Sequence, residues 1–229
     1  MEPNHHLRLN KHLALSLGIS RREADDLIAS GKVSINDTPA ILGARMLATD
    51  TVTVNGKPIA PKTDYVYLLL NKPAGYVCSR RAQGDAPTIY SLLPAEYFGL
   101  KSVGRLDKDS SGLILLTNDG DFTHKLTHPS FQKVKVYEVQ LRQNLEPLHQ
   151  QMISDFGVDL ADGKSQLTLM PLNDSRRDWQ VTMAEGRNRQ IRRTFAALGY
   201  DIAALHRIQF GNYTLGDIKS GEHALTDIR

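Results

Sequence analysis

The sequence has little that would place the protein outside the cell or in a membrane. Its 229 residues include one cysteine, Cys78, so an internal disulfide is impossible, as suits a reducing cytoplasm. We expect Cys78 to be a small buried side chain. No apolar run approaches the ~18 residues that a membrane helix needs. The start, MEPNHHLRLN, lacks the apolar core of a secretion signal. A cytoplasmic protein is therefore expected.

Metal-binding patterns are also missing. Among the eight histidines, His124 and His128 are four residues apart but lack the Glu of a zinc-protease motif. Residues 107–112 match the opening of a calcium loop, but its twelfth position holds Asn118 instead of a bidentate Glu. We therefore expect no metal. The net charge of +3 and the pI near 8.9 are compatible with a nucleic-acid partner but do not indicate one.

The first part of the chain predicts a small unit of two helices and short strands. Leucines recur at helical spacing over residues 9–17, and Gly18 can end that helix. The sequence SRRE at residues 20–23 is a capping box, and it begins a second helix that stops at Gly31. Two alternating segments, each followed by a turn signal, predict strands at residues 32–35 and 51–54.

Basic side chains gather in this small unit. One interpretation is an ordinary solvent-exposed surface of mixed charge, because Glu23, Asp25 and Asp26 lie nearby in the sequence. The alternative is contact with nucleic-acid phosphates, which lysine and arginine neutralise. The basic residues in question are Arg8, Lys11, Arg21, Arg22 and Lys32.

A proline-containing segment separates this unit from the rest of the chain. Pro61 discourages regular structure, so residues 61–64 are the expected linker between a domain at 1–60 and a larger one at 65–229. Strand signals dominate the larger region, without the strand–helix alternation of a parallel sheet, which predicts an α+β fold. Strands are expected at residues 65–70, 112–117, 133–141 and 179–183, and helices at about 121–127, 144–154 and 188–198.

One carboxylate stands out in the larger region. Asp107 lies between Arg105 and Lys108, in a turn that leads into the apolar run at residues 113–116. A rigid strand behind a turn is how a scaffold holds out a reactive group. The alternative is a turn-capping aspartate with a surface ion pair, which contributes little to stability.

Two parts of the sequence resemble known families. The segment RLNKHLALSLGISRREADDLIASGKVSIN resembles the S4 RNA-binding domain. The larger region resembles the pseudouridine synthases, and in particular the RsuA family, which modifies ribosomal RNA and carries an S4 domain in front. The motifs that carry this second resemblance occur in the family's order: LNKPAGY at 70–76, GRLDKDSSGLILLTNDGD at 104–121, KVY at 135–137 and EGRNRQIRR at 185–193.

The resemblance implies a mixed, mainly antiparallel sheet with flanking helices, and an enzyme that isomerises uridine to pseudouridine in ribosomal RNA. It implies that Asp107 is the catalytic carboxylate, that Arg192 holds it ionised, and that Tyr137 packs on a uridine flipped out of the RNA. Tyr137 also alternates with apolar residues, so it is equally a core residue. Lys72 is expected to be structural or to face RNA.

The resemblance also assigns RNA contacts. Arg105 is expected to help fill the place that the flipped nucleotide leaves, and Arg187, Arg189 and Arg193 to lie near phosphates. The reaction needs no metal or cofactor, and the family architecture implies a monomer. The attack of Asp107 on sugar or base and its abstraction of a sugar proton remain equally open.

Two other functions compete with this prediction. A non-catalytic RNA-binding protein of ribosome assembly would use the same basic residues but would not need Asp107. A glycosidase-like hydrolase would need a second carboxylate roughly 5–10 Å away, and Asp109 is the nearest in sequence. The ribosomal subunit also stays open: EGRNRQIRR favours the large-subunit enzymes, whereas KPAGYVCS at residues 72–79 also suits the small-subunit type.

Overall fold

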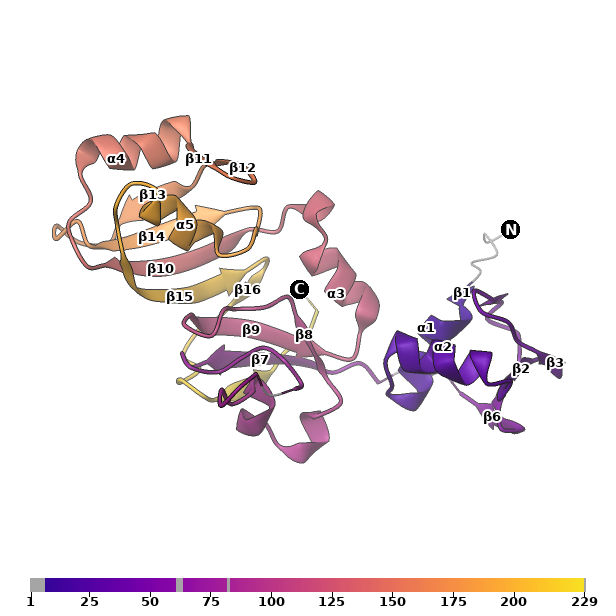
Figure 1. Ribbon diagram of the computed structural model, residues 1–229. Helices are drawn as coiled ribbons and strands as arrows, with labels where there is room; N and C mark the ends of the chain where they lie inside the picture. Colours follow the sequence, from indigo (N-terminus) through magenta and orange to yellow (C-terminus); the bar gives the residue numbers. More distant parts are fainter. Residues whose placement is uncertain (1–6, 61–63, 82, 229) are drawn as a thin grey trace. The chain divides into compact units, whose positions relative to one another are not determined.

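The computed structural model describes residues 7–60, 64–81 and 83–228 (Figure 1). The chain divides into two compact units, Met1–Tyr65 and Val66–Arg229. Residues 61–63 of the expected linker lie outside the described residues.

The two predicted helices of the first unit are present. Helix α1 (Leu9–Leu17) ends at Gly18, whose φ of 71° is the left-handed conformation that glycine adopts without strain. Helix α2 (Arg21–Ala29) begins with the predicted capping box, which is confirmed. The Glu23 amide donates to Ser20 Oγ at 3.1 Å, and the Ser20 amide donates to Glu23 Oε2 at 2.6 Å.

A small sheet completes the first unit. Its strand order is β3-β2-β5-β6, and the predicted turns after β2 and β5 both take positive φ angles, at Asn36-Asp37 and Asn55-Gly56. The strands are β2 (Val33–Ile35), β3 (Thr38–Pro39), β5 (Val52–Val54) and β6 (Lys57–Ile59), with a separate pair β1 (Leu7–Arg8) and β4 (Arg45–Met46). The buried core consists of Leu9, Leu13, Ala24, Ile28, Val33, Met46 and Val52.

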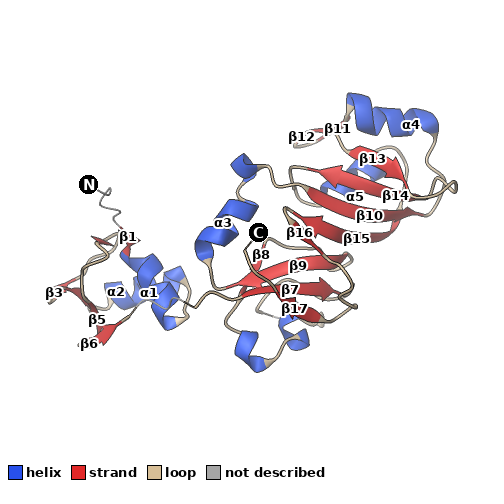
Figure 2. Cartoon of the chain, turned by 180° about the vertical axis from the view of Figure 1, so that it is seen from behind, coloured by secondary structure: helices blue, strands red, loops and turns tan. Residues whose placement is uncertain are grey.

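The second unit is built on one large sheet, with α3 (Gly120–Thr127), α4 (Pro147–Gln151) and α5 (Gln190–Ala196) around it (Figure 2). The main strand order is β13-β14-β10-β15-β9-β7-β17, with β8 beside β9 and β16 beside β15. The strands are β7 (Tyr67–Lys72), β8 (Lys101–Val103), β9 (Ser111–Thr117), β10 (Lys135–Leu141), β13 (Thr168–Pro171), β14 (Asp178–Met183), β15 (Ile202–Phe210), β16 (Tyr213–Thr214) and β17 (His223–Leu225); a separate hairpin joins β11 (Val158–Leu160) and β12 (Gly163–Ser165). The predicted α+β, mainly antiparallel fold is confirmed.

Both faces of the central strands are covered. In β7, Leu68 and Leu70 enter one core cluster while Tyr67 and Leu69 enter another, as the two-residue period of a strand requires. Strand β9 alternates in the same way. The run at 113–116 is therefore apolar at every position because both of its faces are buried.

Strands β9 and β15 form the parallel pair of this sheet, and they pair only at His206↔Ser111 and Arg207↔Gly112. Gly112 has a φ of 102°, and a side chain there would collide with the Arg207 backbone. Glycine is thus required where the two strands meet. Beyond this contact the strands diverge (Figure 2).

Two predicted helices begin later than expected. Helix α4 starts at Pro147, which suits a first helical position, and its last turn continues as a π-helix over Met152–Phe156. Helix α5 starts at Gln190 rather than 188, because Arg189 takes a left-handed φ of 45°. Short 3-10 turns occupy Ile89–Leu92, Ala95–Tyr97 and Pro129–Phe131. Over the described residues, no helix is long and apolar enough to cross a membrane.

Candidate active site

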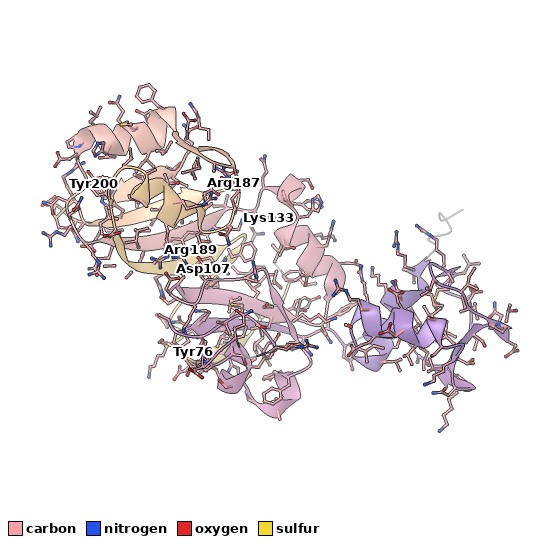
Figure 3. All side chains as sticks on the ribbon, in the orientation of Figure 1. Tyr76, Asp107, Lys133, Arg187, Arg189 and Tyr200 are labelled. Atoms are coloured by element: carbon pink, nitrogen blue, oxygen red, sulfur yellow. The ribbon has the colours of Figure 1, made fainter. Side chains whose placement is uncertain are left out.

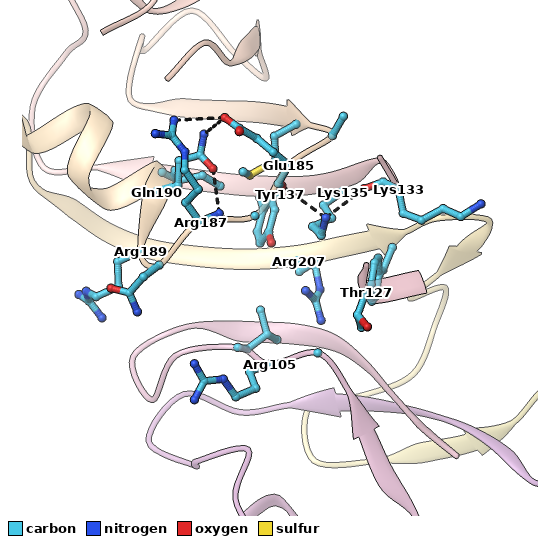
Figure 4. A pocket seen from close by; sticks show the side chains of 18 of the residues that line it. Arg105, Thr127, Lys133, Lys135, Tyr137, Glu185, Arg187, Arg189, Gln190 and Arg207 are labelled. Carbon is cyan, nitrogen blue, oxygen red and sulfur yellow. Dashed lines mark hydrogen bonds and ion pairs between the residues drawn. The ribbon is translucent and has the colours of Figure 1, made fainter. Parts of the chain in front are cut away.

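A pocket of about 420 Å³ opens beside the point where β9 and β15 diverge (Figure 4). One side is the turn at 104–110, and the other combines β10, β15 and the segment at 183–192. The end of α3 and the residues after it complete the rim. The pocket therefore joins segments that are up to about a hundred residues apart in sequence. It brings Arg105, Asp107, Tyr137, Arg187, Arg189 and Arg192 together at one site.

Hydrogen bonds from Lys72 hold the turn that carries Asp107 in place. This side chain is 0% exposed, and its ammonium donates to the carbonyl oxygens of Pro73 at 2.9 Å and Ser110 at 2.5 Å. The Gly75 amide adds a bond to the Lys108 carbonyl at 2.7 Å. Burial lowers the pKa of Lys72. Lys72 is thus a structural residue, which bonds the KPAG turn to the Asp107 turn.

Asp107 and Asp109 share Arg189. Nη1 of Arg189 lies 3.5 Å from Oδ2 of Asp107, and the guanidinium donates to both Asp109 oxygens at 3.0 Å. Figure 3 shows Asp107 and Arg189 side by side. The Arg189 hydrogen bonds hold the pKa of Asp109 below its usual value. Asp107 is 34% exposed, so it remains accessible from the pocket.

The predicted pairing of Arg192 with Asp107 is wrong in this structure. Arg192 instead donates to the Asp109 carbonyl at 2.9 Å, and its Nε lies 3.3 Å from Asp109 Oδ2 without hydrogen-bond geometry. Arg189 and Arg192 both contact Asp109, whereas Arg193 contacts Asp162. Of the three arginines, Arg189 is the one that meets Asp107.

The three arginines predicted near phosphates all have protein partners: Arg189 bonds Asp109, and Arg187 and Arg193 bond the segment at 162–164. Arg187 donates to Asp162 Oδ1 at 3.0 Å and to the carbonyls of Gly163 and Lys164 at 2.8 Å. Arg193 donates to both Asp162 oxygens, at 2.9 and 2.7 Å. The bonds of Arg187 and Arg193 connect the β11–β12 hairpin to α5 and to the segment before it. In this structure these two guanidiniums therefore stabilise the protein framework.

Tyr137 and Arg105 face the pocket from opposite sides (Figure 4). Tyr137 is 8% exposed and belongs to the larger core cluster, so it is at once a core residue and part of the pocket wall. Arg105 is exposed. Next to Arg105, the Leu106 amide donates to Cys78 Sγ at 3.4 Å, and Cys78 is half-buried rather than fully buried.

Some pocket residues escaped the sequence analysis. Strand β15 was not predicted, and it supplies Leu205, Arg207 and Phe210. Its residues over 205–210, LHRIQF, do not alternate regularly between apolar and polar, so the strand signal in the sequence was weak. Lys135 was noted only as part of a motif, although it lines the pocket beside Tyr137.

The basic residues of the first unit belong to a different body from the pocket. Arg8, Arg21, Arg22 and Lys32 are exposed and Lys11 is half-buried. Asn10 bonds Asp25 at 3.0 Å, which links the start of α1 to α2. Over the described residues, no group of three or more histidine, cysteine or acidic side chains could hold a metal ion.

Comparisons with known proteins give the same family for the larger unit and the whole chain. The family described as RNA pseudouridylate synthase matches residues 66–197. The chain is 37% identical to ribosomal small subunit pseudouridine synthase A of Pasteurella multocida, over 95% of this chain and 94% of that one. It is 33% identical to ribosomal large subunit pseudouridine synthase B of Bacillus subtilis, over 94% and 90%. A solved structure described as a pseudouridylate synthase superposes with a TM-score of 0.69 at 33% identity and 96% coverage of both chains. The chain therefore belongs to the RNA pseudouridylate synthase family.

Proposed function

We propose that this protein isomerises uridine to pseudouridine in ribosomal RNA, with Asp107 as the catalytic carboxylate. The observation that carries the proposal is Asp107 itself. It is partly exposed in a nucleotide-sized pocket, beside the Arg189 guanidinium, on a turn fixed by Lys72. The ribosomal names of the relatives support the choice of RNA.

The reaction needs no atoms from outside the substrate apart from proton exchange with water. The bond from uracil N1 to the sugar breaks, the uracil turns over, and C5 bonds to the same sugar carbon. The C5 proton leaves and N1 gains a proton. Asp107 would act on the sugar or the base during these steps.

The neighbouring residues take distinct roles in this proposal. Tyr137 packs on the flipped uracil, because its ring already forms the pocket wall. Arg105 enters the space that the nucleotide leaves. Arg192 holds the turn through the Asp109 backbone instead of meeting Asp107 directly. Arg189 is the cation that faces the catalytic carboxylate.

The first unit acts as an S4-like RNA-binding domain in this proposal. Its exposed cations at Arg8, Arg21, Arg22 and Lys32, with Lys11, contact RNA phosphates. The protein works as a cytoplasmic monomer without a metal or cofactor. Arg187 in the pocket lining and Arg193 in α5 contribute positive potential near the RNA but remain bonded to the β11–β12 hairpin.

The test uses ribosomal RNA from cells that lack the protein. Pseudouridines are marked with a carbodiimide and read as primer-extension stops in both subunits. Wild type, Asp107→Asn and the matched control Asp85→Asn, an exposed aspartate outside the pocket lining, are added back. We expect one stop to vanish and to return with wild type and the control only. Restoration by Asp107→Asn would instead make the protein a non-catalytic RNA-binding protein.

A further inference from the structure

Arg207 is a buried cation without an acidic partner. It is 2% exposed, and none of the ion pairs among the described residues includes it. Its Nε donates to the Leu113 carbonyl at 2.8 Å, and its guanidinium lies 4.9 Å from the centroid of the Phe210 ring. Nη2 is buried and has no hydrogen-bond partner. Buried arginines are normally paired, because an uncompensated buried charge is costly.

A second cation lies on the same ring. The Lys135 ammonium is 5.4 Å from the Phe210 centroid and donates only to neutral carbonyls, those of Lys133 at 3.1 Å and Glu185 at 3.3 Å. Burial and then the nearby Arg207 charge lower the pKa of Lys135. The Glu185 charge acts on Lys135 in the opposite direction. Among the described residues, however, neither Lys135 nor Arg207 has a carboxylate within ion-pair distance. Both line the pocket.

The sheet register places Arg207 between the two main site strands. Arg207 lies opposite Tyr137 of β10 on one side and Gly112 of β9 on the other. Gly112 follows the turn that carries Asp107. Figure 4 shows the Arg207 side chain extending from β15 toward the strand below, between Tyr137 and Arg105. A uracil packed on Tyr137 would therefore present its polar edge within reach of Arg207.

We propose that Arg207, assisted by Lys135, binds the oxygens of the target uracil and stabilises the negative charge that collects on the base during the reaction. This inference rests on the proposed function. When the bond from N1 to the sugar breaks, its electron pair leaves with the uracil, whose charge spreads over N1, O2 and O4. Preorganised cations aimed at developing charge in a water-poor site are effective catalysts. The charge then disappears as C5 bonds to the sugar carbon, after which the C5 proton leaves and N1 gains a proton.

The burial of Arg207 favours the base, rather than a phosphate, as its ligand. The RNA backbone continues beyond the pocket on both sides of a flipped nucleotide, so its phosphates stay near the rim. Arg105 and Arg189 are accessible there, at the more exposed part of the pocket lining. Arg207 is far more buried, and the base is the part of the nucleotide that enters furthest.

The test measures single-turnover rate and RNA affinity separately for wild type, Arg207→Met and Arg207→Lys. Arg176→Met is the matched control, since Arg176 also lies over an aromatic ring, that of Trp179, and bonds a carbonyl, that of Leu145, but is outside the pocket. We expect Arg207→Met to slow turnover by about 100-fold or more at unchanged affinity. Arg207→Lys should fall between it and wild type, and the control should match wild type.

A second substrate tests whether Arg207 acts in the chemical step or only supports the structure. RNA with 5-fluorouridine at the target carries a better-stabilised uracil anion, so consumption of that nucleotide should be slowed less by Arg207→Met than consumption of uridine. The inference would be overturned if Arg207→Met slowed the turnover of both substrates equally. It would also be overturned if Arg207→Met weakened RNA binding while the single-turnover rate of bound RNA stayed normal. If circular dichroism shows that Arg207→Met does not fold, the same comparison is made with Arg207→Lys. An inactive wild type would instead refute the proposed function.

Discussion

Nη1 of Arg189 lies 3.5 Å from Oδ2 of Asp107, although Arg189 precedes helix α5 and Asp107 precedes strand β9. The same guanidinium is held by two bonds to Asp109. Asp109 therefore orients the cation that faces Asp107. The two acids have different tasks in this arrangement, which argues against a hydrolase that uses both of them on the substrate.

We expect Arg189→Gln to reduce kcat/KM on the target RNA by about 10- to 100-fold, since it removes the cation beside Asp107. Arg189→Lys should recover only part of this, because an ammonium cannot form the paired bonds to Asp109. Single-turnover assays with saturating enzyme measure the effect. A full wild-type rate for Arg189→Gln, together with a large loss for Arg192→Gln, would restore the original assignment of Arg192 to Asp107.

Asp109 should make stability depend on acidity. Its folded pKa lies below the ordinary 3.8, so the contribution of its ion pairs is fully present above pH 3.8 and is lost as the pH falls through the folded value. The pair is nearly half exposed, so solvent screening limits the contribution to below about 1 kcal/mol. Urea denaturation of wild type and Asp109→Asn across this range should show the difference shrinking on acidification. A constant difference would refute the linkage.

Gly112→Ala should be strongly destabilising. The new methyl group would collide with the Arg207 backbone, and the φ of 102° is strained for alanine. We expect a loss of about 3 kcal/mol or more in the free energy of unfolding, from chemical denaturation. Gly75→Ala is the matched control, because Gly75 also has a positive φ, 93°, but has nothing within 4 Å of the added atom. Its cost should stay near 1 kcal/mol. Equal losses would show that strain alone matters.

The first unit should add salt-dependent RNA affinity. Replacing Arg21 and Arg22 by alanine should weaken binding and reduce the slope of log K against log salt by about 1.5, if both contact phosphates. Lys57→Ala, an exposed cation of the same unit outside the predicted set, is the control. Filter binding over a salt series measures both quantities. An unchanged slope in the double variant would favour the interpretation as an ordinary solvent-exposed surface of mixed charge.

Local signals in the sequence predicted much of the fold. The capping box at Ser20 and the two Asn-containing turns appear where expected, because each depends on contacts within a few residues. The strand at 111–117 was equally clear, since its continuous apolar run reflects burial on both faces. The family motifs also singled out Asp107 and Tyr137, and both residues line the pocket in the structure.

Features that depend on tertiary geometry were not predictable. The sequence pattern grouped Arg189 with Arg192, and only the folded structure shows that Arg189 rather than Arg192 meets Asp107. Arg207 has no motif of its own, and its importance comes from burial between two other strands. The partner of Arg187 and Arg193, Asp162, lies on a hairpin that carried no sequence signal for them.

The buried ammonium of Lys72 has a consequence for how the protein binds its substrate. Because the Ser110 carbonyl of the Asp107 turn accepts a bond from Lys72 and the Lys108 carbonyl accepts one from Gly75, this turn is ordered before RNA arrives. The conformational entropy of this turn is therefore lost during folding and not during binding. In the proposed reaction, the RNA would therefore provide the adaptation: the nucleotide would leave its stack and move to a carboxylate that is already in position.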